Sequence, residues 1–376
     1  MAIEISLVLP CLNEQDTIRI CVEKANKAFA GGGLSGEVVV VDNGSTDKSV
    51  EIAKNAGAVV VYESAKGYGS ALRRGIDEAN GKYIIMGDSD DTYDFLEIPK
   101  FVKLLREGYD LVMGSRFRGK ILPGAMTWSH RYVGNPILSG MLRLFFGGKV
   151  SDAHCGLRGF SKEAYKKMGL HTTGMEFASE MVIHALKKKL KITEVPITYH
   201  VRRGESKLSS FRDAWRHIRF MLLYSPNYLF LLPAGVIFLA GFLINIRLLF
   251  GPIHFMGRGW DLHVAIFSGM LTILGWQILN LGFAAKAYSH IIGLEESNIT
   301  RRFLEIFNLE RTIIFGVLIF LCGLGMSLYI LYVWAMASFG ELAQIKTGII
   351  ALSFIAMGIQ TIFTGFLTSY LQIKYR

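Results

Sequence analysis

The chain has 376 residues, of which 51% are hydrophobic and 19% are charged, and its formal net charge at pH 7 is +10. The length allows two or more compact units, and the positive charge suits a protein that lies against anionic phospholipid. The sequence carries no nucleic-acid-binding motif, so we expect membrane lipids, and no nucleic acid, among its partners. The charge is unevenly spread, because it nearly vanishes after about residue 227.

The N-terminal part alternates short apolar runs with helical patterns. The runs are continuous, which is typical of strands in a parallel sheet that is covered on both faces. This β-α-β alternation predicts an open, Rossmann-like α/β sheet. The predicted strands are residues 3–8, 37–42, 58–63, 82–88 and 110–115, and the predicted helices lie near 15–30, 46–56, 69–80 and 97–107.

Polar residues follow the predicted strands at the point where each one ends. Ligands of open α/β sheets bind beyond the carboxyl ends of the strands, so we expect these side chains to share one rim. Each is a routine turn residue when taken singly, but together they place acids and bases on one edge. In strand order they are Asn13 and Glu14, which follow Pro10, then Asp42, then Lys66 with its neighbour Gly67, then Asp88 and Asp90, and finally Arg116.

Asp88 and Asp90 form an Asp-x-Asp pair at the end of the fourth predicted strand. Hard oxygen ligands on a short turn suit Mg²⁺ or Mn²⁺, which usually bridge substrate phosphates. Such an ion stabilises a diphosphate as a leaving group. The pair therefore predicts a divalent-metal site beside a nucleotide, in which Glu14 and Asp42 are candidates to hydrogen-bond the base or the ribose.

The glycine-rich stretch 66–75 has the composition of a phosphate cradle at a helix N-terminus. It matches neither the GxGxxG pattern nor a P-loop, so the sequence does not favour a dinucleotide-binding site. Lys66 and Arg116 are candidates to contact phosphate. Further along, Glu176 and Glu180 share one face of a predicted helix, where contact with a sugar or an acceptor and a solvated helix face are both open.

Two segments have the pattern of helices that lie in a membrane interface. In residues 206–227, three arginines recur at helical spacing beside a face of apolar and aromatic residues. That pattern is typical of a helix between acyl chains and headgroups, although an ordinary packing helix is the alternative. Residues 135–148 form a second candidate. We expect both segments to lie on the membrane and to deliver a lipid phosphate to the rim.

Four long apolar segments complete the chain. Helices of about 20 residues cross the hydrocarbon core of a bilayer, and each segment is long enough. A set of buried helices in a soluble protein is disfavoured, because four nearly uncharged runs in succession are hard to bury otherwise. The predicted spans lie at about residues 228–251, 262–285, 312–339 and 347–373.

The connections between these spans predict the orientation. Lysine and arginine are frequent in connection 286–311 and in the C-terminal tail, and rare in connections 252–261 and 340–346. The positive-inside rule then predicts a multi-pass integral membrane protein whose N-terminal domain and two termini are cytoplasmic. We expect an α/β domain over 1–205, an interfacial segment over 206–227 and an all-α transmembrane domain of four helices over 228–376.

The strand-end motifs resemble, as a series, those of family 2 glycosyltransferases, which have the GT-A fold. They are LPCLNE (9–14), VVDNGSTD (40–47), AKGYGSALRRG (65–75), GDSDD (87–91) and GSRF (114–117). The later DAHCGLRGF (152–160) and EVPITYHVRRGESKL (194–208) resemble the polyprenyl-phosphate sugar transferases, such as dolichyl-phosphate mannose synthases and bacterial polyprenyl-phosphate glucosyltransferases. The resemblance covers about residues 3–210 and implies a catalytic domain.

The resemblance also implies a role for each matching residue. Dolichyl-phosphate mannose synthases often have Gln two residues after the second Asp of the pair, where this chain has Thr92, and Asp91 is an added acid. This departure favours UDP-glucose over GDP-mannose as the donor. The implied ligands of the nucleotide-sugar are Pro10, Asn13, Glu14, Asp42, Lys66, Gly67, Asp88 and Asp90, and the last two also bind Mg²⁺ or Mn²⁺. The implied ligands of the lipid phosphate are Arg116, Arg202, Ser206 and Lys207. The implied catalytic residues are Asp90, Asp152, Arg116 and Arg158.

Asp152 is a candidate to orient a neighbouring group, although a structural turn explains it equally well. The implied reaction is an inverting transfer of one sugar from a UDP-glucose- or GDP-mannose-type donor to undecaprenyl or dolichyl phosphate. A lipid phosphate is already an anion near neutral pH, so it needs cationic residues more than a general base. The expected partners are the nucleotide-sugar and the polyprenyl phosphate, and a homo-oligomer is compatible with the sequence.

Two other functions compete with this one. A processive polysaccharide synthase of the same family would carry a Gln-x-x-Arg-Trp motif, which the sequence lacks. A lipid-linked sugar flippase or transporter with a nucleotide-binding domain would be expected to carry charges within its spans, and the four spans are nearly uncharged. The sequence therefore favours the single-sugar transferase.

Overall fold

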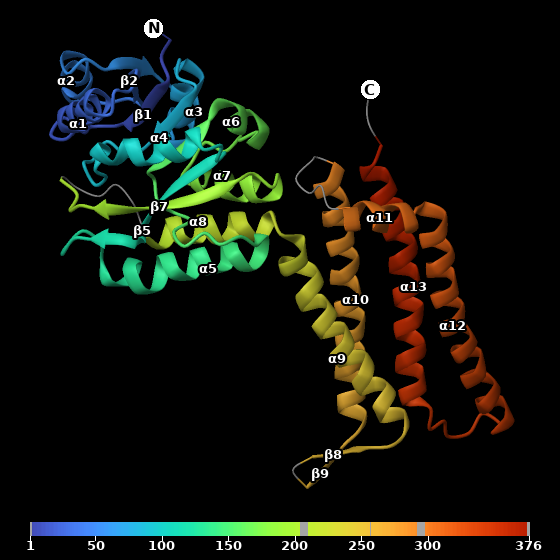
Figure 1. Ribbon diagram of the computed structural model, residues 1–376. Helices are drawn as coiled ribbons and strands as arrows, with labels where there is room; N and C mark the ends of the chain where they lie inside the picture. The colour runs from blue at the N-terminus through green and yellow to red at the C-terminus, as the bar shows by residue number, and fades with distance from the viewer. Residues whose placement is uncertain (1, 204–209, 256, 292–297, 374–376) are drawn as a thin grey trace. The chain divides into compact units, whose positions relative to one another are not determined.

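The structure is a computed structural model, and it describes residues 2–203, 210–255, 257–291 and 298–373. The described chain divides into two compact units, Met1–Met221 and Leu222–Arg376 (Figure 1). The predicted domain boundaries near residues 205 and 227 stay predictions. Ser206 and Lys207, which the sequence predicts as lipid-phosphate ligands, lie outside the described residues.

The first unit is built on a mixed sheet. Its described residues form seven strands in the order β3-β2-β1-β4-β6-β5-β7. β1 pairs in parallel with both β2 and β4, and β2 with β3, whereas β6 runs antiparallel to β4 and β5. β5 pairs in parallel with β7. The strands are β1 (Ile5–Cys11), β2 (Gly36–Asp42), β3 (Val59–Tyr62), β4 (Tyr83–Met86), β5 (Leu111–Ile121), β6 (Arg158–Ser161) and β7 (Ile192–Tyr199).

The five predicted strands correspond to β1–β5, and the predicted helices to α1–α4. In α1 (Ile18–Gly31), buried residues such as Ile18, Val22 and Phe29 recur at helical spacing and pack into the hydrophobic core with β1 and β2. The predicted open α/β sheet is therefore confirmed. The other three helices are α2 (Ser49–Asn55), α3 (Tyr68–Glu78) and α4 (Ile98–Arg106), which follows the short 3₁₀ turn η1 (Phe95–Glu97).

The described residues in the second half of this unit form four more helices. α7 (Phe177–Lys187) is buried from Phe177 to Ala185, so the solvated-face interpretation of Glu180 is wrong. α8 (Ser210–Leu223) exposes Trp215 and buries His217. The others are α5 (Asn135–Phe146), preceded by the π-helical turn η2 (His130–Gly134), and α6 (Lys162–Met168).

The second unit is helical. Its described residues include four helices long and apolar enough to cross a membrane, Asn227–Leu249, Leu262–Ile291, Leu309–Met336 and Ile345–Leu371. They correspond to the four predicted spans. Its elements are η3 (Asn227–Leu231), α9 (Leu232–Leu249), the hairpin of β8 (Ile253–Phe255) and β9 (Arg258–Trp260), α10 (Leu262–Ile291), α11 (Asn298–Ile306), α12 (Leu309–Met336) and α13 (Ile345–Leu371).

Glycines allow these helices to pack closely. A Cβ on Gly275 of α10 would lie 2.4 Å from the backbone nitrogen of Phe238 in α9. A Cβ on Gly358 of α13 would lie 2.6 Å from the backbone nitrogen of Phe320 in α12. Small residues at crossings are typical of helices packed within a bilayer, so the helix contacts support the membrane assignment independently of hydropathy.

Candidate active site

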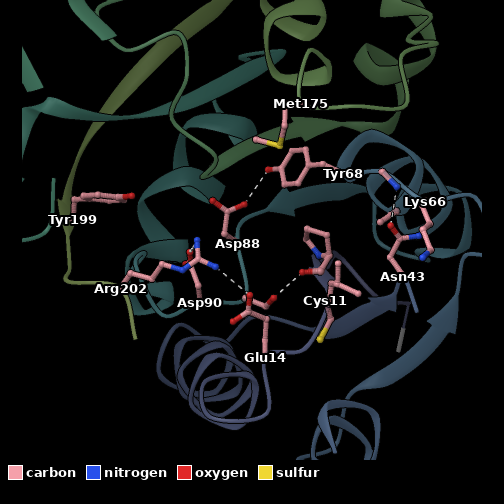
Figure 2. A pocket seen from close by; sticks show the side chains of 15 residues that line it. Cys11, Glu14, Asn43, Lys66, Tyr68, Asp88, Asp90, Met175, Tyr199 and Arg202 are labelled. Atoms are coloured by element: carbon pink, nitrogen blue, oxygen red, sulfur yellow. Dashed lines mark hydrogen bonds and ion pairs between the residues drawn. The ribbon is translucent and has the colours of Figure 1, made fainter. Parts of the chain in front are cut away.

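A cavity of about 350 Å³ opens at the carboxyl ends of β1, β2 and β4. Parallel strands bring their carboxyl ends to one edge of a sheet, so residues far apart in the sequence meet here. Figure 2 shows side chains converging on this space from the strand ends and from the start of α3. The described residues that line it are Pro10, Cys11, Leu12, Glu14, Asn43, Lys66, Gly67, Tyr68, Ala71, Asp88, Ser89, Asp90, Met175, Tyr199 and Arg202.

Three acids and one arginine form the polar centre of the cavity. Nη2 of Arg202 lies 3.2 Å from Oε1 of Glu14, and its Nη1 lies 3.2 Å from Oδ2 of Asp90. Asp88 also faces this space and accepts a hydrogen bond from the hydroxyl of Tyr68 at 3.0 Å (Figure 2). The sequence predicted Arg202 as a ligand of the lipid phosphate, but its contacts are with predicted ligands of the donor and the metal.

Asp88 holds its proton unusually tightly. Burial, and then the negative charge of Asp90, raise the pKa of Asp88 to about 7, against the opposing effects of Tyr68, Arg202 and Arg116. Burial raises the pKa of Tyr68 well above its usual value, so this phenol stays neutral and donates to the carboxylate. A cation bound at the two acids would favour the ionised form of Asp88 and release its proton.

The loop that begins α3 forms one wall of the cavity. Gly67 adopts a φ of +145°, and its N–H donates to Oδ1 of Asn43 at 2.8 Å. A Cβ at Gly67 would lie 2.2 Å from the carbonyl oxygen of Thr173. Glycine is therefore required here by both the backbone conformation and the close approach, and Tyr68 is held in reach of Asp88.

A buried carboxylate supports that wall from behind. Glu180 in α7 accepts hydrogen bonds from the N–H of His171 at 3.0 Å, and from the N–H and hydroxyl of Thr172 at 3.0 and 2.6 Å. The carbonyl oxygens of Thr172 and Thr173 lie against Gly69 and Gly67. Glu180 thus orders the backbone on which the glycine loop rests, instead of facing a substrate.

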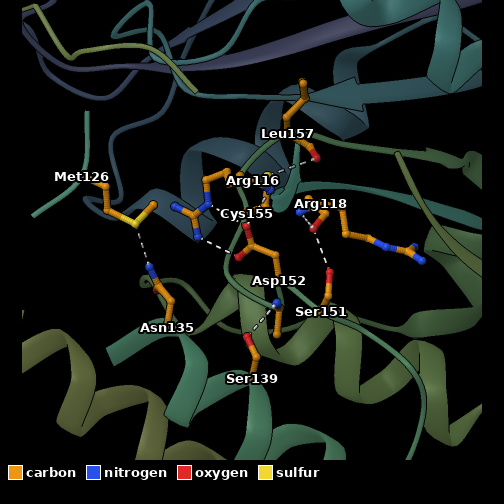
Figure 3. A network of polar contacts seen from close by, with 12 residues as sticks. Arg116, Arg118, Met126, Asn135, Ser139, Ser151, Asp152, Cys155 and Leu157 are labelled. Atoms are coloured by element: carbon orange, nitrogen blue, oxygen red, sulfur yellow. Dashed lines mark hydrogen bonds and ion pairs between the residues drawn. The ribbon is translucent and has the colours of Figure 1, made fainter. Parts of the chain in front are cut away.

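Figure 3 shows Arg116 and Asp152, which form a buried ion pair. Oδ2 of Asp152 accepts from the backbone N–H and Nε of Arg116 at 3.0 and 2.7 Å, and Oδ1 accepts from Nη2 at 2.7 Å. Burial opposes the charge on Arg116, but Asp152 outweighs it and raises the pKa of Arg116. The guanidinium lies 5.2 Å from the ring centre of Tyr199, so Asp152 orients Arg116 just behind a residue that lines the cavity.

Arg158 has a different place from the one that the sequence suggested. It is fully buried, and it donates to the carbonyl oxygens of Cys155, Ala178 and Ala153 at 2.8, 2.6 and 2.8 Å. These contacts join the loop that carries Asp152 to α7. The geometry therefore supports a structural role for Arg158 in place of the catalytic role that the resemblance implies.

Asp42 and Asn13 also hold loops at the rim. Asp42 accepts from the N–H groups of Gly44 and Ser45 at 3.3 and 3.0 Å, and Oδ1 of Asn13 accepts from the N–H of Thr46 at 2.7 Å. Neither is among the described residues that line the cavity. They shape the loop beside the cavity, and a direct contact with the nucleotide stays a prediction.

The predicted site lacks eight of the described residues that line the cavity, namely Cys11, Leu12, Asn43, Tyr68, Ala71, Ser89, Met175 and Tyr199. Asn43 and Tyr68 lie inside the motifs VVDNGSTD and AKGYGSALRRG, so a signal for them was present. Met175 and Tyr199 reach the cavity from the loop before α7 and from the end of β7. Tyr199 lies inside the motif EVPITYHVRRGESKL, whereas no local pattern marks Met175, because tertiary packing alone brings it to the strand ends.

The acids fit a metal ion that arrives with a phosphate-bearing ligand. Among the described residues, no group of three or more His, Cys, Asp or Glu is placed to hold an ion by itself. Asp88 and Asp90 both line the cavity. Mg²⁺ is commonly held by one or two carboxylates together with substrate phosphates, so the pair suits that arrangement rather than a cage made only of protein ligands.

Comparison with known proteins agrees with this geometry. The sequence pattern of glycosyl transferase family 2 matches residues 6–169, and that of the glycosyltransferase family 2 C-terminal transmembrane region matches residues 283–372. A low-salt glycan biosynthesis hexosyltransferase of Haloferax volcanii is 41% identical over 364 residues, which cover 96% of this chain and 88% of that protein. The chain therefore belongs to glycosyltransferase family 2 and is a membrane glycosyltransferase.

Two further relatives are more distant. A dolichyl-phosphate hexose transferase of Haloferax volcanii is 32% identical, over 55% of this chain and 88% of that protein. A dolichol-phosphate mannosyltransferase of Pyrococcus furiosus is 27% identical, over 64% of this chain and 70% of that protein. Both matches are shorter than the match to the hexosyltransferase, which extends over nearly the whole chain.

Proposed function

We propose that the protein transfers a single sugar from a nucleotide-sugar to polyprenyl phosphate, with inversion at the anomeric carbon. The observation that carries the proposal is the cavity at the strand ends, which combines Glu14, Asp88 and Asp90 with Lys66 and Arg202. Acids suit the base, the ribose and a divalent ion, and cations suit phosphates. Few other ligands need both sets within one cavity.

On the donor side, the chain's residues bind and orient the nucleotide-sugar. Asp88 and Asp90 would hold Mg²⁺ or Mn²⁺, which supplies charge neutralisation of the diphosphate when bound. Pro10 and Glu14 line the side of β1, where a base or ribose would lie, and Lys66 stands at the start of α3, where it would meet a phosphate.

On the acceptor side, the phosphate of the lipid is itself the nucleophile, so the protein needs to position it and offset its charge. Arg116, held in one orientation by Asp152, is the proposed partner of that phosphate, and Ser206 and Lys207 stay proposed ligands of the headgroup. Attack from the face opposite the leaving diphosphate inverts the anomeric centre.

Exposed apolar residues support the proposal that the catalytic domain lies at the membrane surface. Trp128, Tyr132 and Leu144, in and just before the η2–α5 segment, are 70, 59 and 62% exposed. Amphipathic helices that lie in the interface present such side chains to the acyl boundary. A catalytic domain held there by α5 and α8 would meet a lipid-linked phosphate without extracting it from the bilayer.

The names of the relatives favour the same reaction. They include a hexosyltransferase, a dolichyl-phosphate hexose transferase and a dolichol-phosphate mannosyltransferase. We propose a hexose on a UDP-glucose- or GDP-mannose-type donor, with UDP-glucose preferred because Thr92 stands where mannose synthases often have Gln.

The test is a panel of radiolabelled UDP- and GDP-sugars, incubated with membranes that contain the full chain, polyprenyl phosphate, Mg²⁺ and Mn²⁺. We expect chloroform-extractable label with one donor, and none with the Asp90→Asn variant, whose membrane insertion is checked by immunoblot. The Asp77→Asn variant, changed at an exposed position of α3, is the matched control. Label in a long polymer would favour a processive synthase, and no extractable label with any donor would contradict the proposal.

A further inference from the structure

Two residues of the Asp-rich turn, Asp91 and Thr92, have been given no contact or structural task in the function proposed so far. They are 5 and 1% exposed, so they do not form a solvated acidic loop. They follow the metal-ligand candidate Asp90 directly in the sequence. Their contacts give each of them a definite task.

The backbone N–H and the hydroxyl of Thr92 both donate hydrogen bonds to one oxygen of Asp90. Its N–H donates to Oδ1 of Asp90 at 3.1 Å, and its hydroxyl donates to that oxygen at 2.6 Å. Its carbonyl oxygen accepts from the N–H of His200 at 2.9 Å, just beyond β7. The hydrogen-bonding groups of Thr92 therefore fix the carboxylate of Asp90, and Thr92 itself does not line the cavity.

The two hydrogen bonds leave the oxygens of Asp90 unequal. Oδ1 is turned toward Thr92, and Oδ2 lies 3.2 Å from Nη1 of Arg202. A carboxylate held by two donors on one oxygen cannot rotate freely about its last side-chain bond. Oδ2 is therefore the atom presented to positive charge in the cavity.

Asp91 makes this turn possible. Its φ is +61°, in the left-handed region that favours glycine but that Asp tolerates better than most residues. That conformation folds Thr92 back over Asp90. The carboxylate of Asp91 points elsewhere, with Oδ1 2.7 Å from Nζ of Lys24 in α1 and Oδ2 3.6 Å from Nε of Arg203, so α1 anchors the turn.

We propose that Thr92 is a positioning residue for Asp90, and that the Asp91–Lys24 pair fixes the turn in which it acts. The proposal rests on the proposed function, because it gives Oδ2 of Asp90 the task of meeting the cation of the donor diphosphate. Thr92 then orients the metal ligand Asp90, and its own side chain does not bind the metal. This accounts for the point at which the motif departs from that of the mannose synthases.

The first experiment measures binding of Mn²⁺ to the purified full-length chain in detergent, by electron paramagnetic resonance, with UDP or GDP present. Thr92→Val removes the hydroxyl but keeps the shape and the backbone N–H. Loss of a hydrogen bond to a charged group predicts about tenfold weaker binding of Mn²⁺. Thr92→Ser keeps the hydroxyl and is expected to stay within about twofold of wild type. Thr193→Val, in β7, is the matched control and should have no effect.

A purely structural role for Thr92 predicts a different pattern. It would lower the melting temperature of Thr92→Val and leave Mn²⁺ affinity unchanged in the folded fraction. Wild-type affinity in folded Thr92→Val, or equal weakening in Thr92→Val and Thr92→Ser, would overturn the proposal. Failure of the wild-type chain to bind Mn²⁺ with either nucleotide would overturn it as well.

A double-mutant cycle tests the anchor. Asp91→Asn and Lys24→Met are each expected to weaken Mn²⁺ binding, and the double variant should be no weaker than the worse single variant. Fully additive effects would contradict the pairing. These assays need no acceptor, so a chain that shows the expected metal pattern but labels no lipid would remove the proposed function and leave the role of Thr92 in place.

Discussion

Asp88 places a titrating proton at the centre of the candidate site. Its pKa of about 7 comes first from burial and then from Asp90, so near neutral pH the acid is poised between its two forms. A divalent ion binds the ionised form and expels the proton. Binding of the ion releases one proton from Asp88 when the pH is below the pKa of Asp88. The apparent affinity for the ion therefore rises by up to about tenfold for each pH unit in that range.

We therefore expect binding of Mn²⁺ with UDP or GDP to strengthen as the pH rises through about 7 and to level off above about 8. Calorimetry in buffers of different ionisation enthalpy should count about one proton released near pH 6. In Asp88→Asn, binding should be weak and its dependence on pH should flatten over this range. Equal slopes for wild type and Asp88→Asn would show that another group takes up the proton.

At the scale of elements, the wall of the cavity depends on two loops pressed together. Residues 171–173, ordered by Glu180, lie against Gly67 and Gly69. Gly67→Ala would place a methyl group 2.2 Å from the carbonyl oxygen of Thr173, at a φ of +145°. The loops must then separate, and Tyr68 loses its position beside Asp88.

Gly67→Ala is expected to lower the melting temperature and to raise the KM for the donor. Gly33→Ala is the matched control, since Gly33 has a φ of +60° but an added methyl group there would meet no atom within 4 Å. The control should cost only about 1–2 kcal/mol of left-handed strain and leave the KM unchanged. Equal KM values for both variants, measured with the donor that labels lipid, would show that the contact with Thr173 does not shape the site.

The sequence predicted the elements whose stability is local and missed those that depend on neighbours. β1, β2 and β4 are continuous apolar runs, and their buried residues carry a strong signal. β6 is the short run RGFS, which contains the buried Arg158 and gains its pairing from β4 and β5 on either side. β7 contains Pro196 and partly exposed positions. β6 has no local pattern that favours strand formation, and in β7 a run of β-branched residues is interrupted by Pro196, which weakens the strand signal.

The same division applies to the candidate site. Because ligands of open α/β sheets bind beyond the carboxyl ends of the strands, the sequence predicted that Glu14, Lys66 and Asp88 lie together, and all three line one cavity. The sequence did not indicate that Arg158 lies inside the protein, because a fully buried arginine is recognisable only by the carbonyl groups that surround it. Met175 was missed for a related reason, since it reaches the cavity from the loop before α7 and lies in none of the motifs.

At the scale of the whole molecule, each unit has its own source of stability. The first unit has a hydrophobic core between sheet and helices. The second has long apolar helices with small residues at their crossings, which require a bilayer around them. The net charge of +10 is thus concentrated outside the spans, where it bears on orientation and on the membrane surface.

The connections between the long helices of the second unit lie at its two opposite ends. An ion pair between Lys346 and Asp261 joins the start of α13 to the connection before α10, so the connections 250–261 and 337–344 lie at the same end of that unit (Figure 1). This end carries Arg247, which donates to the carbonyl oxygen of Gly251, together with Arg258 and the paired Lys346. The other connection carries Lys286, Arg301, Arg302 and Arg311. The positive-inside rule predicts that the arginine-poor end faces away from the cytoplasm.

Single cysteines test this orientation in intact cells with a membrane-impermeant maleimide. Cys322 is replaced by Ser, because it is exposed on α12, while Cys11, Cys21 and Cys155 are buried and stay. Gly259→Cys and Glu341→Cys should be labelled from outside, and Glu305→Cys in α11 and Glu51→Cys in α2 only after permeabilisation. Labelling of Glu305→Cys in intact cells, with Glu341→Cys protected, would reverse the orientation and place the candidate active site away from cytoplasmic nucleotide-sugars.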